Sequence, residues 1–286
     1  GLFIHQLGKG KCFFSKKYWK YALWFNIPLV PHYLSQAILN SSDRIMINNM
    51  VDSSAAGIYS LAYSISSMMI IFNTALVNTI SPWIYTKIKE RKLGEIAGTS
   101  YLTMIMVAFV NLALIAFAPE AVSIFAPKSY YDAIWIIPPV AMSVYFMYAY
   151  DIFAKFQFYF EKTKFVMIAS SISAIVNIIL NYIFIKLFGY YAAGYTTLFC
   201  YALYTVSHYL FMNKIIRENL DGFKVFDTKI LLAITFLMLI LGFIMLFLYN
   251  FIYVRYSVIL LTFIVCVIKR NQIIGICKSV FELKNK

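Results

Sequence analysis

An aspartate and an arginine, Asp43 and Arg44, lie side by side near the end of a long apolar run that begins at about Trp19. A charge at the centre of a membrane costs roughly 2.5–3.5 kcal/mol on insertion scales, so such residues usually face a helix-bundle interior or a wet cavity. The pair can also simply end a membrane helix at the outer interface, because adjacent residues on a helix do not face each other. The two residues alone leave both interpretations open.

The polar residues that precede this pair recur at helical spacing. On a helical wheel, His32, Gln36, Asn40 and Asp43 fall within one sector, and Arg44 lies at its edge. At a rise of 1.5 Å per residue, this stripe extends over about 18 Å of the helix. It predicts either hydrogen bonds between helices or the lining of a cavity.

Two other apolar segments carry similar stripes. In residues 55–82 and 165–187, polar side chains recur on one face; they are Tyr63, Ser67, Thr74 and Asn78 in the first segment, and Ser170, Ser173, Asn177 and Asn181 in the second. Three striped helices together predict a shared hydrophilic interior, a watery passage with the Arg44 guanidinium near its outer end.

Signals for other chemistry are missing from the sequence. The three histidines are scattered and the four cysteines show no paired spacing, so neither a metal site nor a disulfide framework is expected. No nucleophile–base pair or phosphate-binding loop is visible. We therefore expect a protein that is not an enzyme and has no cofactor.

The composition predicts an all-α membrane protein. Hydrophobic residues make up 62% of the 286 residues and charged residues only 13%, whereas about a quarter of a soluble domain is charged. A membrane-spanning helix needs roughly 20 mostly apolar residues. Eight segments meet that length approximately: 21–48, 55–82, 99–118, 136–155, 165–187, 190–211, 230–249 and 251–268.

The net charge of +13 follows from this topology. With eight crossings, all but four of the 25 Lys and Arg residues fall on one side of the membrane. Basic loops stay in the cytoplasm, so both ends of the chain are expected there and nucleic-acid binding is not. The four exceptions are Arg44, Lys128, Lys186 and Arg255. We interpret Lys186 and Arg255 as interfacial cations whose heads reach water.

The same reading predicts the organisation of the chain. In order, the predicted parts are a cytoplasmic linker (1–20), a six-helix lobe (21–211), a cytoplasmic loop (212–229), two additional peripheral membrane helices (230–268) and a basic cytoplasmic tail (269–286). Because the chain begins at Gly1 without a methionine, we expect it to be the later part of a longer protein.

Three stretches carry a resemblance to a known family. They are "YWKYALWFNIPLVPHYLSQAILNSSDRIMINNMVDSSAAGIYSLAYSIS", "APEAVSIFAPKSYYDAIWIIPPVAMS" and "NIILNYIFIKLFGYYAAGYTTLFCY". The first combines a proline pair with His32, then Asn40, the Asp43–Arg44 pair and a Gly-Ile-Tyr step. Their order and spacing resemble the second half of polysaccharide repeat-unit flippases, the O-antigen and capsule exporters of the multidrug/oligosaccharidyl-lipid/polysaccharide (MOP) superfamily.

The resemblance implies a transporter of two lobes with a central cavity and alternating access, of which this chain is the C-terminal lobe. It implies transport of an undecaprenyl-diphosphate-linked oligosaccharide across the bacterial cytoplasmic (inner) membrane, with a proton or sodium gradient as the candidate driving force. The expected partners are this lipid-linked oligosaccharide, membrane lipid, the missing N-terminal lobe and, as a candidate, a polysaccharide polymerase. The alternatives are a drug or metabolite exporter of the same superfamily and a membrane-embedded polymerase or glycosyltransferase.

A flippase must carry a diphosphate and sugars through a region where both lose hydration. An arginine can replace water around phosphate through its bidentate fork, and amides and hydroxyls can bond sugar hydroxyls. The candidate substrate-binding residues are Arg44, Asp43, His32, Gln36, Asn40, Tyr63, Asn177 and Asn181.

Overall fold

The computed structural model describes residue 5, residues 8–10 and residues 14–282, and this part of the chain contains helices but no strand. The predicted linker (1–20) and the predicted tail (269–286) lie partly outside the described residues. The helices, in order, are α2 (Lys16–Asn26), α3 (Leu29–Met50), α4 (Ser53–Lys89), α5 (Leu93–Ala116), α6 (Ala118–Phe125), η1 (Lys128–Trp135), α7 (Ile137–Tyr159), α8 (Thr163–Phe188), α9 (Ala192–Asn219), α10 (Thr228–Phe247), η2 (Leu248–Asn250), α11 (Ile252–Ile268) and α12 (Arg270–Glu282).

All eight predicted segments are helical, so the all-α helix bundle is confirmed. The count of eight spans is not. Within the described residues, α4, α5, α8 and α10 are each long and apolar enough to cross a membrane, and the number rises to six if two bent helix pairs each form one span. These pairs are η1 with α7, bent by 48°, and α11 with α12, bent by 74°. The helices α3 and α9 fall short because their polar residues lower the mean hydropathy.

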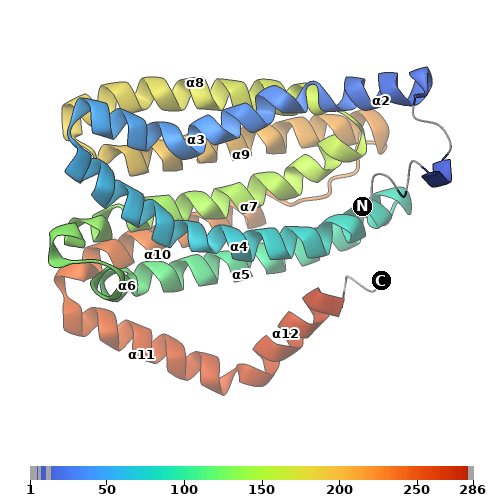
Figure 1. The fold of residues 1–286 in the computed structure, drawn as a ribbon. Helices are drawn as coiled ribbons and strands as arrows, with labels where there is room; N and C mark the ends of the chain where they lie inside the picture. The colour runs from blue at the N-terminus through green and yellow to red at the C-terminus, as the bar shows by residue number, and fades with distance from the viewer. Residues whose placement is uncertain (1–4, 6–7, 11–13, 283–286) are drawn as a thin grey trace.

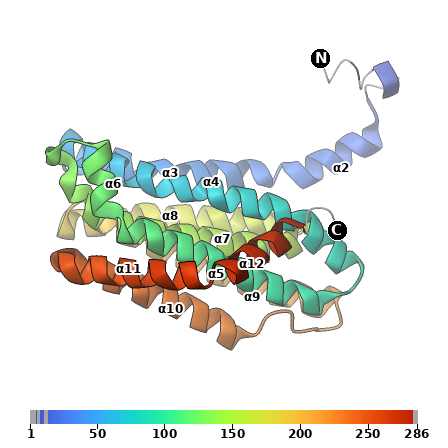
Figure 2. The same cartoon turned by 90° about the horizontal axis from the view of Figure 1, so that it is seen from below.

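The helix α7 is the centre of the bundle (Figures 1 and 2). Most of its residues are buried, and it packs chiefly against α9, α4 and α5. A helix that is apolar on every side is stable only when neighbours surround it, and α7 has that pattern. The helix α8 packs against α9 and α3, so α3 reaches the bundle mainly through α8 and α4.

Local sequence explains where the helices begin and end. Pro28 is the N-cap of α3 and separates it from α2, because proline lacks the backbone N–H that a helix interior needs. The Asp52 carboxylate accepts a bond of 2.8 Å from the Ala55 backbone N–H and caps α4, as an N-cap aspartate should. Gly189 ends α8 with φ of +76°, a conformation that other residues rarely adopt.

The boundaries near the C-terminus differ from those predicted. The helix α9 continues to Asn219, into the predicted loop, and part of the predicted tail forms α12. The helix α10 packs against α5 and α7. At Gly242 the approach is so close that an added Cβ would lie 2.6 Å from the Met142 sulfur.

The interpretation of Arg255 as an interfacial cation is wrong. Its side chain is only 3% exposed, and Nη2 lies 2.5 Å from Glu120 Oε1 in an ion pair. Nη1 also donates to Glu120 Oε2 at 3.2 Å and to the Ala116 carbonyl at 3.3 Å. A buried guanidinium is stable here because α6 supplies a carboxylate, a partner that no local pattern around Arg255 reveals. Lys186 is exposed, as expected.

Candidate functional site

The Asp43 carboxylate lies in the bundle interior and is 1% exposed. Its Oδ2 accepts hydrogen bonds from the Tyr59 hydroxyl at 2.6 Å and the Thr197 hydroxyl at 2.8 Å, and its Oδ1 accepts one from Asn181 Nδ2 at 2.5 Å. The donors come from α4, α9 and α8. Hydrogen bonds to a charged acceptor are stronger than those between neutral groups. Through these bonds, four helices meet at one carboxylate.

The two asparagines of α8 extend this arrangement. Asn177 Oδ1 accepts bonds from Asn181 Nδ2 at 3.1 Å and from the Ser42 hydroxyl at 3.2 Å. The Thr196 hydroxyl donates to Asn181 Oδ1. We call the residues Asp43, Tyr59, Asn177, Asn181 and Thr197 the aspartate cluster.

One turn before Asp43 in α3, Asn40 makes further polar contacts. Its Oδ1 accepts bonds from the Tyr63 hydroxyl at 2.8 Å and the Tyr201 hydroxyl at 3.2 Å. Tyr63 belongs to α4 and Tyr201 to α9. These two tyrosine side chains therefore link α4 and α9 to α3.

One and two turns before Asn40, the polar residues of this face continue, but several of their buried atoms have no hydrogen-bond partner among the described residues. His32 and Gln36 of α3 approach Tyr204 and His208 of α9, and we call these four residues the histidine cluster. The buried polar atoms without a hydrogen-bond partner within the described residues include His32 Nδ1, Gln36 Nε2, the Tyr204 hydroxyl oxygen and both His208 ring nitrogens. The two clusters, joined by Asn40 and Tyr201, form one polar seam between α3 and α9.

Arg44 does not pair with Asp43. No ion pair involving its guanidinium is found among the described residues; instead Nη2 donates to the Asn40 carbonyl at 2.7 Å, and Cζ lies 5.1 Å from the centre of the Tyr63 ring. The side chain is half-buried. No carboxylate among the described residues pairs with its remaining N–H groups, so the guanidinium can bind an anionic group.

The predicted stripe on α4 divides between two environments. Tyr63 is buried and joins the seam, but Thr74 and Asn78 are exposed and Ser67 is half-buried. With Ser60 and Ser64, these residues follow one another at intervals of three, four or seven, so they lie on one helix face, together with the exposed Ile71. The rest of the described chain covers this face only in part. We call Ser60, Ser64, Ser67, Thr74 and Asn78 the open face of α4. The Tyr63 ring, and Arg44 over it, lie at the edge of this face.

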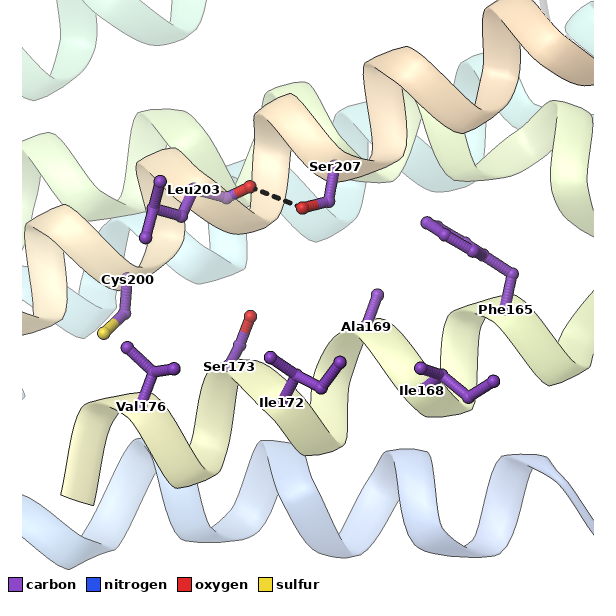
Figure 3. A pocket seen from close by; sticks show the side chains of 9 residues that line it. All are labelled: Phe165, Ile168, Ala169, Ile172, Ser173, Val176, Cys200, Leu203 and Ser207. Atoms are coloured by element: carbon purple, nitrogen blue, oxygen red, sulfur yellow. Dashed lines mark hydrogen bonds between the residues drawn. The ribbon is translucent and has the colours of Figure 1, made fainter. Parts of the chain in front are cut away.

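The expectation of a single watery passage inside this chain is therefore wrong. The stripes of α3 and α8 do turn inward, but in the aspartate cluster their side chains bond one another and leave no open channel. A cavity of about 250 Å³ lies elsewhere, between α8 and α9 (Figure 3). Its lining includes Phe165, Ile172, Val176 and Leu203 and is mostly apolar, and none of the predicted binding residues contributes to it.

Sequence reasoning missed the contribution of α9. Thr197, Tyr201, Tyr204 and His208 recur at intervals of three or four residues, which places them on one helix face. This spacing was a usable signal, but the intervening apolar residues make α9 resemble an ordinary membrane span. Among the described residues, no group of three or more His, Cys, Asp or Glu side chains could hold a metal ion.

Comparison with solved structures places the fold among transporters. The structure aligns with a MOP superfamily transporter from Pyrococcus furiosus, with a TM-score of 0.52, 18% sequence identity and coverage of 81% of this chain. The chain spans 53% of the length of that transporter. That protein is reported to have a binding pocket of reversed polarity that suggests a different function. The fold is thus that of MOP-type transporters, and the chain is a multi-pass membrane protein.

A comparison with sequence families matches the first part of the chain. Residues 2–88 match the family model of polysaccharide biosynthesis proteins. This region includes the α3 half of the seam and almost all of α4. The resemblance to polysaccharide transporters of the MOP superfamily, predicted from the Asp43–Arg44 region, is confirmed. No curated protein matches the chain significantly.

Proposed function

We propose that this chain is the C-terminal lobe of a flippase that moves an undecaprenyl-diphosphate-linked oligosaccharide across the bacterial cytoplasmic membrane. The observation that carries the proposal is the open face of α4 with Arg44 beside it. Polar side chains on a membrane helix face protein or water far more often than lipid. A second lobe of the same protein, placed opposite α4, would enclose this face in a passage.

Within that passage Arg44 is the group that meets the diphosphate. Its free N–H groups can bind two phosphate oxygens at once, and the Asn40 carbonyl and Tyr63 ring hold the guanidinium in place. The hydroxyls and amide of the open face can replace water around sugar hydroxyls. Asp43, His32, Gln36, Asn177 and Asn181 lie behind this face in the seam, and we assign them to the coupling of transport rather than to sugar contact.

Coupling needs a site whose occupancy differs between states of the transporter. Asp43 is a buried carboxylate of α3 that donors from three other helices contact, so binding of a proton or a sodium ion would change the contacts among all four helices. The lobe would then rock against its partner around the passage.

The orientation of the chain follows from the basic residues. Both ends of the described chain and the loop between α4 and α5 lie at one end of the bundle, and α6 lies at the other (Figure 1). Lys87, Arg91 and Lys92 are near that loop. The positive-inside rule supports a cytoplasmic location for this end. Membrane lipid, the second lobe and a polysaccharide polymerase are the partners that belong to the proposal.

The test replaces Arg44 by alanine in the full-length protein and measures polysaccharide at the cell surface. Export should be lost while the amount of protein in the membrane is unchanged. Lys186→Ala is the matched control, because Lys186 is also a cation near the α6 end of the bundle but is exposed, away from the seam. Normal export in Arg44→Ala would remove Arg44 from the mechanism. Intact polysaccharide with raised drug sensitivity in a deletion strain would replace the substrate class by a drug.

A further inference from the structure

The two halves of the polar seam differ in how well their hydrogen bonds are satisfied. In the aspartate cluster, the carboxylate has three donors and both asparagines have partners. In the histidine cluster, five buried nitrogen and oxygen atoms have none within the described residues. A buried polar atom without a partner costs about 1–3 kcal/mol, so five at one place would be a large penalty.

His208 is the extreme case. It is 0% exposed and neither ring nitrogen has a partner. An imidazole always has at least one N–H donor, and a neutral ring also has one acceptor, so both requirements are unmet. Its ring is surrounded by aromatic groups, with the centres of Tyr204 at 4.4 Å, Tyr150 at 5.5 Å and Phe165 at 5.7 Å.

Internal water would satisfy these atoms. Buried water molecules typically make about three hydrogen bonds to polar groups that lack other partners, and the histidine cluster offers donors and acceptors from two helices. The Ser170 hydroxyl of α8 also lies near the Tyr204 hydroxyl. The site is therefore polar on several sides, which distinguishes it from a dry apolar cavity.

Polar groups of α7 also lie around His208. Gln157 Nε2 of α7 donates to the His208 carbonyl at 3.1 Å, while Gln157 Oε1 is buried without a partner. On the same helix, Asp151 pairs with Lys155 at 3.6 Å, and the Asp151 side chain is 37% exposed. Asp151 also lies near Tyr150 and Tyr204, the two tyrosines beside His208, so polar groups connect the buried imidazole to a partly exposed carboxylate.

We propose that the histidine cluster is an internal water-binding site, and that its water connects His208 to solvent at Asp151 so that the imidazole exchanges protons there. In this step an unprotonated ring nitrogen accepts a proton from a hydronium ion and leaves a water molecule, and the reverse step returns the proton. The titratable or charged groups around His208 are His32 on α3, Tyr150, Asp151 and Lys155 on α7, and Tyr204 on α9. The nearest α8 side chain whose ring contacts it, Phe165, carries no charge.

The proposal deepens the proposed function, on which its second part rests. Tyr201 and Asn40 lie between His208 and Asp43 along the seam. A proton on His208 would place a cation beside His32 and the tyrosines, and would change the contacts between α3 and α9. Transport should then respond to pH through this residue.

The first experiment needs neither substrate nor variant. Deuterium exchange at the C2 position of histidine, measured by mass spectrometry on the full-length protein in lipid nanodiscs, reports access of water to each imidazole. His208 should take up deuterium, with a rate that titrates with pH; the exposed His5 is the internal reference. Absence of uptake at His208, while His5 exchanges normally, would overturn the water site.

Two matched variants localise the water. Tyr204→Phe removes a partnerless hydroxyl inside the histidine cluster and should slow exchange at His208. Tyr148→Phe removes a partnerless hydroxyl of the same kind that lies near Thr103 of α5, outside the seam. It should leave the exchange unchanged; equal effects of the two variants would contradict the assignment.

The second experiment measures export as a function of pH for His208→Asn and His208→Gln. Both amides keep hydrogen bonding but do not titrate, so the pH dependence of the initial rate should be lost while some export remains. An unchanged pH dependence in a variant that is stably inserted would overturn the proton-exchange role. Failure of the wild-type protein to export polysaccharide would instead contradict the proposed function, and the exchange measurement would still decide the water site.

Discussion

Asp43 shows what a single buried charge requires. The helical wheel of α3 correctly places it on the same face as His32, Gln36 and Asn40, and the structure buries that face. What the wheel does not contain is the set of donors. Tyr59, Thr197 and Asn181 come from three other helices, and each satisfies one of the demands of a carboxylate that has lost its water.

Tyr59→Phe tests how much one of these donors contributes. The substitution removes only the hydroxyl, which lies 2.6 Å from Asp43 Oδ2, at a position that is 0% exposed. Leaving a buried acceptor short of a donor costs about 1–3 kcal/mol, so the thermal unfolding midpoint in detergent should fall. Tyr182→Phe is the control, because Tyr182 is 58% exposed, and it should not change the midpoint. Equal midpoints for Tyr59→Phe and the wild type would show that the hydroxyl contributes little.

The elements differ in how they are held to the bundle. The helix α7 is surrounded on all sides, whereas α11 lies at the edge, as both views show (Figures 1 and 2). Its attachment to the rest of the lobe includes the Arg255–Glu120 ion pair and a bond of 2.5 Å from the Tyr256 hydroxyl to the same carboxylate. At α11, an ion pair thus provides part of the attachment that apolar packing provides for the other helices.

Substitution of the two partners should show this coupling. Arg255→Met or Glu120→Leu alone leaves an unpaired charge and should destabilise the lobe by about 3–5 kcal/mol, whereas the double variant replaces both charges by apolar groups and should cost much less. Unfolding of the purified protein in detergent, arranged as a double-mutant cycle, measures the coupling.

The exposed pair of Arg91 and Asp221 is the control for that cycle. Its atoms are 2.8 Å apart, but both side chains are more than half exposed, and surface pairs contribute about 0–1 kcal/mol. Arg91→Ala should therefore have little effect. Additive effects of the two changes at Arg255 and Glu120 would argue against a coupled buried pair.

For the whole molecule, the basic residues and the helix order predict which end faces the cytoplasm. Cysteine labelling of the full-length protein, with its native cysteines replaced, tests this orientation in intact cells. Asp132→Cys in η1 should react with a membrane-impermeant maleimide from outside, and Lys92→Cys between α4 and α5 should react only after lysis. Both positions are exposed, so access to the reagent differs only by the side of the membrane. The reverse pattern would invert the topology.

The arrangement of whole helices also explains why a single passage is not found inside this chain. The stripes of three helices were expected to meet one cavity, but α4 carries polar residues toward both the interior and the outside. Since the chain spans 53% of the similar transporter, the open face of α4 is where we propose that a second lobe completes the passage. A lobe whose interior is tightly packed can still form one wall of a binding site that lies between two lobes.

The sequence by itself determined the helical class, the membrane character, the polysaccharide-transport resemblance and the inward face of α3, because hydropathy and helical period are local properties. It also indicated the orientation, through the placement of basic loops. Only the tertiary structure decided that Asp43 is held by donors from α4, α8 and α9, that Arg255 is buried against Glu120, and that His208 lacks partners. Each of these depends on residues far apart in the chain, and which side chains meet across a bundle is set by packing rather than by any local pattern.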